Sequence, residues 1–319
     1  MSLRVAVQMD PIEAVGIAGD STFALMLKAQ ALGHRLFHYL ARDLAYEDGQ
    51  VRALAREVIV ERVEGNHFRA GEPAVIDLRR DIDVVLMRQD PPFDIAYITA
   101  TYLLERLAGE TLVVNDPKSV RDAPEKLFVL DFAHFMPPTL ITRSLAEVER
   151  FHAAHREIVL KPLHGNAGAA VFRIGEDGHN LKALAELFLE TWPEPFIAQA
   201  FLPAVAEGDR RIVLVDGEVA GAINRIPAQG EIRSNLAAGG RAEAVELDER
   251  EREICAALGP ELKRRGLLFV GIDVIGGMLT EINVTSPTGI VALDAFNGTD
   301  TPALIWQAIE RRFAERVHG

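Results

Sequence analysis

The chain has 319 residues, of which 49% are hydrophobic and 25% charged, so it can fold into two or three domains and is not a disordered chain. Its 34 basic residues are outnumbered by 47 acidic ones, and the net charge of -13 argues against binding to nucleic acid or to an anionic membrane. A single cysteine, Cys255, excludes an intramolecular disulfide. With no signal region and no apolar stretch near the roughly 18 residues that span a bilayer, we expect a cytoplasmic protein.

The first third of the sequence alternates short strand-like runs with helical patterns. Strands are predicted at residues 3–9, 35–39, 84–87 and 111–114, and helices after Asp20-Ser21 and at 97–107. This alternation is typical of a mostly parallel α/β sheet, in a first domain that spans residues 1–124. Ligands of such sheets gather at the carboxyl ends of the strands, where polar residues occur at 9–11, 88–92 and 115–117.

The pattern changes near residue 125 and indicates two further domains, 125–203 and 204–319. The middle domain is predicted to have helices at 125–134, 145–155 and 181–190 and strands near Leu140 and at 158–161, 171–174 and 196–199. The last domain is predicted to have a hairpin that turns at Asp216-Gly217, helices at 248–265 and 301–317, and a second hairpin at 269–284. Residues 226–241 show no periodicity, and a loop of that length inside a compact protein is often a lid.

The second hairpin carries the sharpest chemical signal, which depends on the length of its turn. A three-residue turn at 276–278 pairs Asp273 with Glu281, whereas a two-residue turn pairs Asp273 with Thr280. We predict the longer turn, because only that register separates the apolar from the polar side chains. It places Asp273, Glu281 and Asn283 on one face, with cross-strand Cβ atoms about 5 Å apart. Such oxygen ligands suit Mg²⁺ bound together with substrate phosphates; the alternative is the solvated face of an ordinary hairpin.

The two common nucleotide-binding fingerprints are missing, so a phosphate site must have another form. Lys161 ends a buried strand and is followed by a small-residue loop with Gly165, Asn166 and Gly168, whose N–H groups could approach phosphate oxygens. Lys126 offers a second cation. The extended segment Gln199, Ala200, Phe201 and Leu202 could pair with an adenine edge, and Glu207 and Asp209 offer acceptors for ribose hydroxyls.

These features occur in the order found in the ATP-grasp superfamily, and several segments resemble bacterial glutathione synthetases more closely. The segments that carry the resemblance are Met9-Asp10-Pro11, Asp20-Ser21 and residues 87–94, 235–241 and 280–288. The last two, Asn-Leu-Ala-Ala-Gly-Gly-Arg and Thr-Glu-Ile-Asn-Val-Thr-Ser-Pro-Thr, are the most specific to that family. The resemblance spans nearly the whole chain.

The resemblance implies an ATP-grasp fold with an N-terminal parallel α/β domain, a middle lid domain and a C-terminal α+β domain. It implies ATP-dependent joining of γ-glutamylcysteine to glycine through an acyl phosphate, with Mg²⁺ or, as the alternative ion, Mn²⁺, in a homotetramer. By analogy, Lys126 and Lys161 hold the ATP phosphates, and Arg211 and Arg225 act with Lys161 at the transferring phosphoryl group. The residues assigned to the peptide substrate or glycine are Asp20, Ser21, Arg88, Asp90, Arg233, Asn235, Ser286 and Thr288.

Three positions depart from the family pattern. His164 stands where an acidic residue is expected, Ala169 where a second glycine is expected, and Gln89 where a lysine is expected. These departures concern the phosphate loop and the recognition of a substrate carboxylate. Two other functions stay open: an ATP-grasp ligase with a different acceptor, and a nucleotide-binding regulator without catalytic activity.

Overall fold

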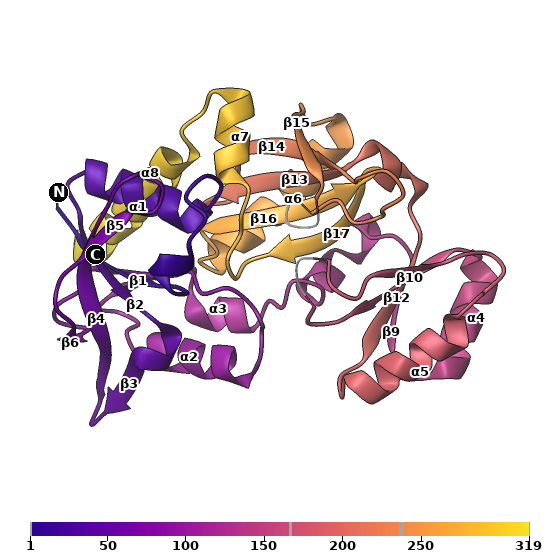
Figure 1. The fold of residues 1–319 in the computed structure, drawn as a ribbon, viewed down its shortest axis with the longest axis horizontal. Helices are drawn as coiled ribbons and strands as arrows, with labels where there is room; N and C mark the ends of the chain where they lie inside the picture. Colours follow the sequence, from indigo (N-terminus) through magenta and orange to yellow (C-terminus); the bar gives the residue numbers. More distant parts are fainter. Residues whose placement is uncertain (1, 166–167, 236–238, 319) are drawn as a thin grey trace.

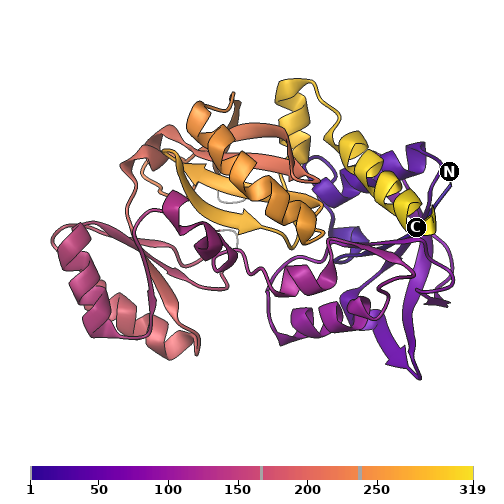
Figure 2. The same ribbon diagram turned by 180° about the vertical axis from the view of Figure 1, so that it is seen from behind.

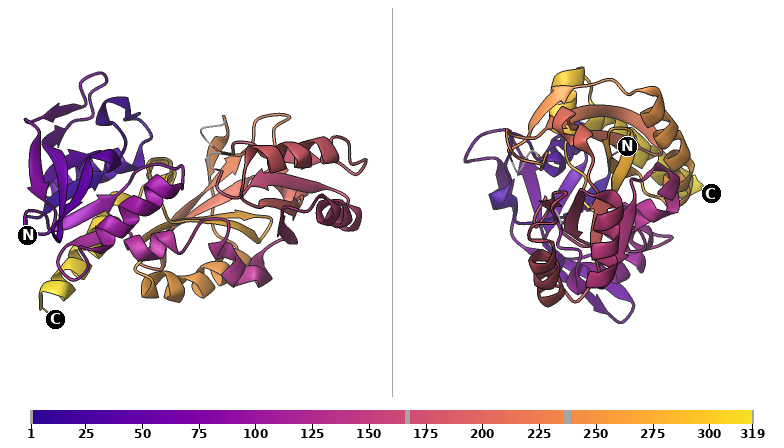
Figure 3. Two further views of the ribbon diagram at one scale, coloured as in Figure 1. Left: turned by 90° about the horizontal axis from the view of Figure 1, so that it is seen from below. Right: turned by 90° about the vertical axis from the view of Figure 1, so that its right-hand side faces the viewer.

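The computed structural model describes residues 2–165, 168–235 and 239–318, which form three β-sheets that follow one another along the chain (Figure 1). The first sheet lies at the end of the molecule that holds both termini, the second lies at the far end, and the third lies between them (Figure 3). Among the described residues, no helix combines the length and the apolar character that a membrane span requires.

The first sheet has eight strands, in the order β3-β4-β2-β1-β7-β8 with β5 and β6 paired to β4. Strands β2, β1, β7 and β8 are parallel, as the alternation of strands and helices predicts. The antiparallel extension β3 to β6, between residues 44 and 77, was not predicted. The elements of this region are β1 (Arg4–Gln8), η1 (Ile12–Ala14), α1 (Ser21–Ala31), β2 (Arg35–Tyr39), η2 (Ala41–Asp43), β3 (Leu44–Glu47), β4 (Gln50–Val60), β5 (Phe68–Ala70), β6 (Ala74–Asp77), β7 (Val84–Met87), α2 (Ile95–Glu105), β8 (Leu112–Val114) and α3 (Pro117–Arg121).

The second sheet is antiparallel, in the order β11-β10-β12-β9. Its elements are β9 (Thr139–Thr142), α4 (Leu145–His155), β10 (Ile158–Pro162), β11 (Phe172–Ile174), α5 (Leu181–Thr191) and β12 (Phe196–Ala200). Helices α4 and α5 lie on the same side of this sheet (Figure 2), and their residues Phe151 and Phe188 belong to one apolar cluster with Leu160 of β10. The segment predicted as a helix at 125–134 is instead the 3-10 segment η3 (Phe128–Phe135), which is kinked at Phe132.

The third sheet is also antiparallel, in the order β15-β14-β13-β16-β17. Helices α6 and α7 cover its opposite faces: Leu258 of α6 packs in one apolar cluster with Ile272, and Leu293 of α7 packs in another with Val213. The closing helix α8 returns to the first sheet, where Trp306 Nε1 donates to Leu25 O of α1. The elements are η4 (Pro203–Glu207), β13 (Asp209–Val215), β14 (Glu218–Ile226), β15 (Arg241–Ala244), α6 (Glu249–Arg264), β16 (Phe269–Ile275), β17 (Met278–Asn283), α7 (Ile290–Asn297) and α8 (Thr301–His318).

One buried side chain, Asn115, joins the first sheet to the third. It follows β8 directly, and its Nδ2 donates to Phe269 O at 2.7 Å and to Val284 O at 2.8 Å. Its Oδ1 accepts from Phe269 N at 2.8 Å. From the sequence, Asn115 lies at a strand end where ligands gather. In the structure its side chain instead bonds to Phe269 of β16 and to Val284 directly after β17, and these two strands form the hairpin in which the metal site is predicted. Cys255 is buried in α6, and burial raises the pKa of its thiol to about 12.

Asn115→Ala is expected to lower the midpoint of thermal unfolding by several degrees. The substitution leaves one N–H and two C=O groups buried without partners, and each such group costs about 1–3 kcal/mol. Asn66→Ala is the matched control, because Asn66 is exposed and its side chain makes no hydrogen bond with the described residues. Thermal unfolding followed by circular dichroism measures the midpoints of both variants. Equal midpoints would contradict the role of Asn115 in joining the first sheet to the third.

Candidate active site

A cavity of about 420 Å³ lies where the three sheets meet, and it collects most of the residues that the sequence singled out. Its walls come from the loop after β7, from β10 and its loop, from β12, and from strands β13, β14, β16 and β17 of the third sheet. The predicted site residues that line it are Asp90, Lys126, Lys161, Gly165, Gly168, Gln199, Ala200, Phe201, Leu202, Asp209, Arg211, Arg225, Arg233, Asn235, Asp273, Glu281, Asn283, Ser286 and Thr288.

The hairpin β16–β17 pairs Asp273 with Glu281, as predicted, but by a different route. Ile275 pairs with Met278, so the turn has two residues, Gly276-Gly277, and the prediction of a three-residue turn is wrong. The register shifts by one residue between Asp273 and Val274, so Thr280 is the extra residue of a β-bulge. Thr280 Oγ1 donates to Asp273 O at 3.1 Å, which holds the bulge in place. The bulge brings Glu281 to the face of the sheet on which Asp273 lies.

Asp273 is held by two arginines from neighbouring strands. Arg211 of β13 donates from Nε to Asp273 Oδ1 at 2.6 Å and from Nη2 to Oδ2 at 3.0 Å. Arg225 of β14 lies with its Nη2 3.0 Å from Asp273 Oδ1. Burial alone would raise the pKa of the Asp273 carboxyl, but the two guanidinium groups outweigh it and hold the pKa well below its usual range. Asp273 is therefore ionised, and Arg211 is fixed by a two-point contact.

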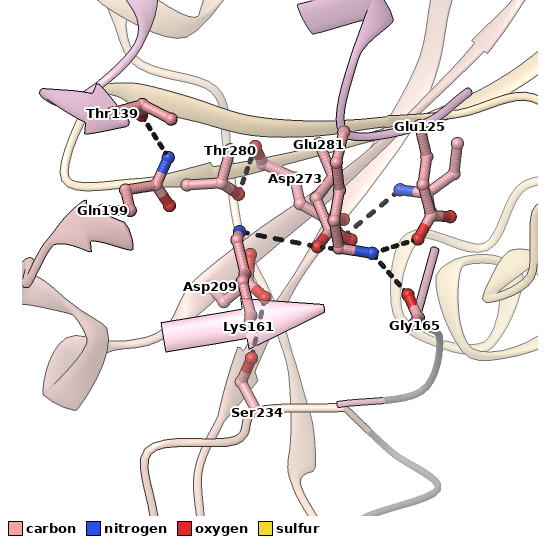
Figure 4. Close-up of polar contacts among 12 residues, drawn as sticks. Glu125, Thr139, Lys161, Gly165, Gln199, Asp209, Ser234, Asp273, Thr280 and Glu281 are labelled. Carbon is pink, nitrogen blue, oxygen red and sulfur yellow. Dashed lines mark hydrogen bonds and ion pairs between the residues drawn. The ribbon is translucent and has the colours of Figure 1, made fainter. Parts of the chain in front are cut away.

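Two lysines lie close to Glu281, and Figure 4 shows the contact of one of them, Lys161, with this carboxylate. Lys126 Nζ lies 3.5 Å from Glu281 Oε1, and Lys161 Nζ lies 3.8 Å from the same oxygen. Lys126 also donates to Glu125 and to Gly165 O. Burial tends to lower the pKa of Lys126, yet Glu281 and Glu125 raise it above its usual value, whereas burial lowers the pKa of Lys161. Two buried cations that share one carboxylate are suited to a ligand that carries several negative charges.

The oxygen donors of the hairpin fit a divalent metal that arrives with phosphates. Glu281 and Asn283 both line the cavity, and Asn283 Nδ2 contacts Asp273 Oδ2 at 3.4 Å, which leaves its amide oxygen free of that contact. Among the described residues, no group of three or more His, Cys, Asp or Glu side chains is arranged as a metal site by itself. Mg²⁺ commonly takes only one or two carboxylates and completes its shell with substrate phosphates and water, so the donor set suits it.

The predicted phosphate loop follows β10 and lines the cavity with Gly165, Gly168 and Ala169. A Cβ at Gly168, where φ is +73°, would lie 2.8 Å from Asn235 Oδ1, so glycine lets this loop and the loop after β14 meet. Asn166 lies outside the described residues. His164, one of the departures from the family pattern, has its ring stacked on Phe93, with 6.0 Å between the centroids.

The adenine and ribose assignments have different outcomes. Gln199 and the three residues after it line the cavity, so the segment is where an adenine could pair. Glu207 does not line the cavity, and Asp209 Oδ2 accepts from Ser234 Oγ at 2.7 Å and from Arg225 Nη2. Burial raises the pKa of the Asp209 carboxyl. The structure therefore gives no support to ribose contacts from Glu207 or Asp209.

Three predicted substrate residues, Asp20, Ser21 and Arg88, do not line the cavity. Arg88 is buried, and it donates from Nε to Thr22 Oγ1 at 3.0 Å and from Nη2 to Pro287 O at 2.8 Å. Asp20 caps α1 by accepting from Phe23 N, and the Ser21 side chain is buried. Gln89, the third departure, accepts a hydrogen bond from Gln8 and does not line the cavity. Direct substrate contacts from Asp20, Ser21 and Arg88 are therefore not supported.

Some cavity residues were not singled out from the sequence, among them Glu125, Ser234 and Thr280. Glu125 stands next to Lys126 in the chain, and burial raises the pKa of its carboxyl. Ser234 directly precedes the family-specific segment that begins at Asn235, and this position in the sequence could have indicated that Ser234 belongs to the site. The longer turn predicted from the sequence leaves Thr280 on the face opposite to Glu281, because regular alternation does not reveal a bulge.

Comparison with known proteins identifies the family. The model for the prokaryotic glutathione synthetase N-terminal domain matches residues 3–121, and the model for the ATP-grasp domain of the same enzymes matches residues 125–298. A relative from Rhodopseudomonas palustris, named glutathione synthetase, is 57% identical over 314 residues, which cover 98% of this chain and 100% of the relative.

Two solved structures have the same fold at low sequence identity. D-cycloserine synthetase DcsG matches with a TM-score of 0.68 at 18% identity, over 97% of this chain and 99% of that chain. The ATP-grasp ligase PsnB, complexed with a precursor variant, Mg and ADP, matches with a TM-score of 0.61 at 18% identity, over 99% of each chain. The expected α/β architecture is confirmed by these likenesses, and the matches to both family models show that the chain belongs to the prokaryotic glutathione synthetase family and has the ATP-grasp fold.

Proposed function

We propose that the chain joins γ-glutamylcysteine to glycine at the expense of ATP, giving glutathione, ADP and phosphate. The observation that carries this proposal is the pairing of Glu281 with two buried lysines beside the Arg211–Asp273–Arg225 cluster, in one cavity of a family member. A ligase with another acceptor is less favoured, because the 57% identical relative that carries the glutathione synthetase name matches over its full length. A regulator without catalytic activity is disfavoured by the intact charged residues.

In the first half of the reaction, a carboxylate oxygen of γ-glutamylcysteine attacks the γ-phosphorus of ATP. The bond from that phosphorus to the β–γ bridging oxygen breaks, and an acyl phosphate and ADP result. Lys126 and Lys161 would neutralise the phosphate oxygens, while Arg211 and Arg225 would stabilise the charge that spreads over the transferring group. Arg211 is preorganised for this role, because its contact with Asp273 leaves it little freedom.

In the second half, the amine of glycine attacks the acyl carbon and phosphate leaves, with loss of one proton from the amine. An acyl phosphate is lost to hydrolysis if water reaches it, so the site must be closed while it exists. The loop between β14 and β15 contributes Arg233, Ser234 and Asn235 to the cavity, which supports its role as a lid. Ser234 is bonded to Asp209, so the described part of the loop is anchored at the site.

We infer that Glu281 and Asn283, with Asp273 beside them, would hold Mg²⁺ or, as the alternative ion, Mn²⁺. Bound with ATP, the ion would supply positive charge at the β- and γ-phosphate oxygens. Of the substrate assignments, we keep Asp90, Arg233, Asn235, Ser286 and Thr288, which line the cavity. The division at residues 124 and 203 and the cytoplasmic location remain proposals that rest on the sequence pattern, and the homotetramer remains a proposal that rests on the family resemblance.

The activity is tested by phosphate release from the purified protein with ATP, Mg²⁺, γ-glutamylcysteine and glycine, each omitted in turn. Release that needs all four, with formation of glutathione in equal amount, is the expected result. Release that occurs only with another acid or amine would keep the ligase and overturn the substrate assignment. ATP binding without release on any pair would instead indicate the regulator.

Glu281→Gln is expected to lower the rate of glutathione formation about 100-fold, the size of effect typical of lost metal support or charge stabilisation. The Mg²⁺ concentration needed for half-maximal rate should rise. Metal-free ATP should bind at least as tightly as to the unchanged protein, because Lys126 and Lys161 lose a competing anion. Calorimetry without metal and a Mg²⁺ series measure the two effects. Glu190→Gln, at an exposed position of α5, is the control that should change neither.

Arg211→Lys is expected to lower kcat about 10- to 100-fold, because lysine cannot reproduce the planar two-point contact with Asp273. Arg210→Lys is a matched control on the adjacent residue of β13, where the side chain pairs with Asp248 and Glu251 outside the cavity. We expect Arg210→Lys to retain kcat even where it lowers stability. Steady-state kinetics and thermal unfolding of both variants separate the cases; similar kcat losses would argue against a role for the two-point contact.

A further inference from the structure

The side chain of Gln199 is held at the cavity wall by a threonine of the neighbouring strand. Gln199 of β12 pairs with Thr139 of β9, so the two side chains lie on the same face of the second sheet. Gln199 Nε2 donates to Thr139 Oγ1 at 2.8 Å. Figure 4 shows the amide nitrogen directed at Thr139 and the amide oxygen on the other side of the group. Among the described residues, no donor is bonded to that oxygen, so it is available to a ligand.

The direction of this amide follows from the position of one hydroxyl proton. Thr139 Oγ1 lies 2.8 Å from Pro137 O, and a carbonyl oxygen can only accept. Two oxygens stay that close when the hydroxyl proton lies between them, so Thr139 donates to Pro137. The hydroxyl then offers only lone pairs to Gln199, which must present its NH₂ group. The acceptor end of Gln199 is thereby turned away from Thr139.

The backbone fixes the positions of Thr139 Oγ1 and Pro137 O, which together set the orientation of the Gln199 amide. Thr139 is the first residue of β9 and follows Pro137-Pro138, whose rings restrict φ. Ala200 N donates to Pro138 O at 2.9 Å, which ties this corner to the end of β12. The hydroxyl and the carbonyl that receives its proton are therefore held in a constant relation to Gln199. A serine at position 139 would keep the relation, whereas a valine of the same shape would remove it.

We propose that Thr139 is a positioning residue that, through Gln199, makes the site select a purine with a 6-amino group over one with a 6-oxo group. A 6-amino group can donate to Gln199 Oε1, while a 6-oxo group would bring a second acceptor against it. A site built to hydrogen-bond one group rejects an analogue that leaves its buried polar atoms unpaired. The inference rests on the proposed function in one respect: the purine must lie along Gln199, Ala200, Phe201 and Leu202.

The test compares ATP with inosine triphosphate (ITP), which carries a 6-oxo group and lacks the 2-amino group of guanine. Glutathione formation by the full chain, with γ-glutamylcysteine, glycine and Mg²⁺, gives kcat/KM for each nucleotide. Thr139→Val should reduce the preference for ATP about tenfold, the worth of one hydrogen bond, because the amide can then turn either end to the base. The change should lie in KM, with kcat at saturating ATP retained. Thr139→Ser should keep the preference of the unchanged chain.

A double-mutant cycle separates this role from a general loss of packing. In a Gln199→Ala background, Thr139→Val should have no further effect on the ATP-to-ITP ratio, because Thr139 acts only through Gln199. An unchanged ratio in Thr139→Val, or an equal fall in the Gln199→Ala background, would overturn the proposal. The Kd values of ATP and ITP, measured by calorimetry without the other substrates, test Thr139 even if the assigned ligation does not occur. A failure of the proposed function would show instead as binding without glutathione formation.

Discussion

The site depends on a buried carboxylate, Asp273, held between the guanidinium groups of Arg211 and Arg225. Only 3% of Asp273 is exposed, and without the arginines its charge would be strongly disfavoured. The three residues lie on the adjacent strands β16, β13 and β14, and Arg211 is the cross-strand neighbour of Asp273. Removing Asp273 would leave the buried guanidinium of Arg211 without its carboxylate partner, which costs several kcal/mol. The strand order β14-β13-β16 is thus what allows the third sheet to carry charges at its centre.

The second charge cluster draws on different parts of the molecule. Glu281 comes from the third sheet, Lys161 from the second sheet, and Lys126 from the segment that connects the first sheet to the second. At 3.8 Å, Glu281 only partly offsets the burial of Lys161, whose pKa is lowered. Lys161 therefore keeps a positive charge that is only partly neutralised by the described residues around it. This balance of charge suits a ligand with several negative charges, in keeping with the ATP-grasp family to which the chain belongs.

The hairpin shows what sequence patterns can and cannot predict. Alternation of apolar and polar side chains reports the face on which each residue lies, and on that basis the pairing of Asp273 with Glu281 was predicted and is confirmed. Alternation does not report where an extra residue sits. Gly276 and Gly277 both have positive φ and form a two-residue turn whose twist suits a hairpin, so the extra residue is Thr280 in the strand. Alternation therefore predicted the pairing correctly, and it could not predict the turn because it does not report the position of an extra residue.

Two residues at strand ends have partners far away in the sequence, and these contacts were not predicted. Arg88 and Asn115 stand at the carboxyl ends of parallel strands, where ligands of α/β sheets gather. In this chain that edge is where the third sheet docks: Asn115 holds Phe269 and Val284, and Arg88 holds Pro287. Partners about 150 to 200 positions away leave no periodic trace in a single sequence. The edge that would meet a ligand in an isolated α/β domain instead holds the segment from Val284 to Pro287, so it contributes to the site by positioning a wall of the cavity.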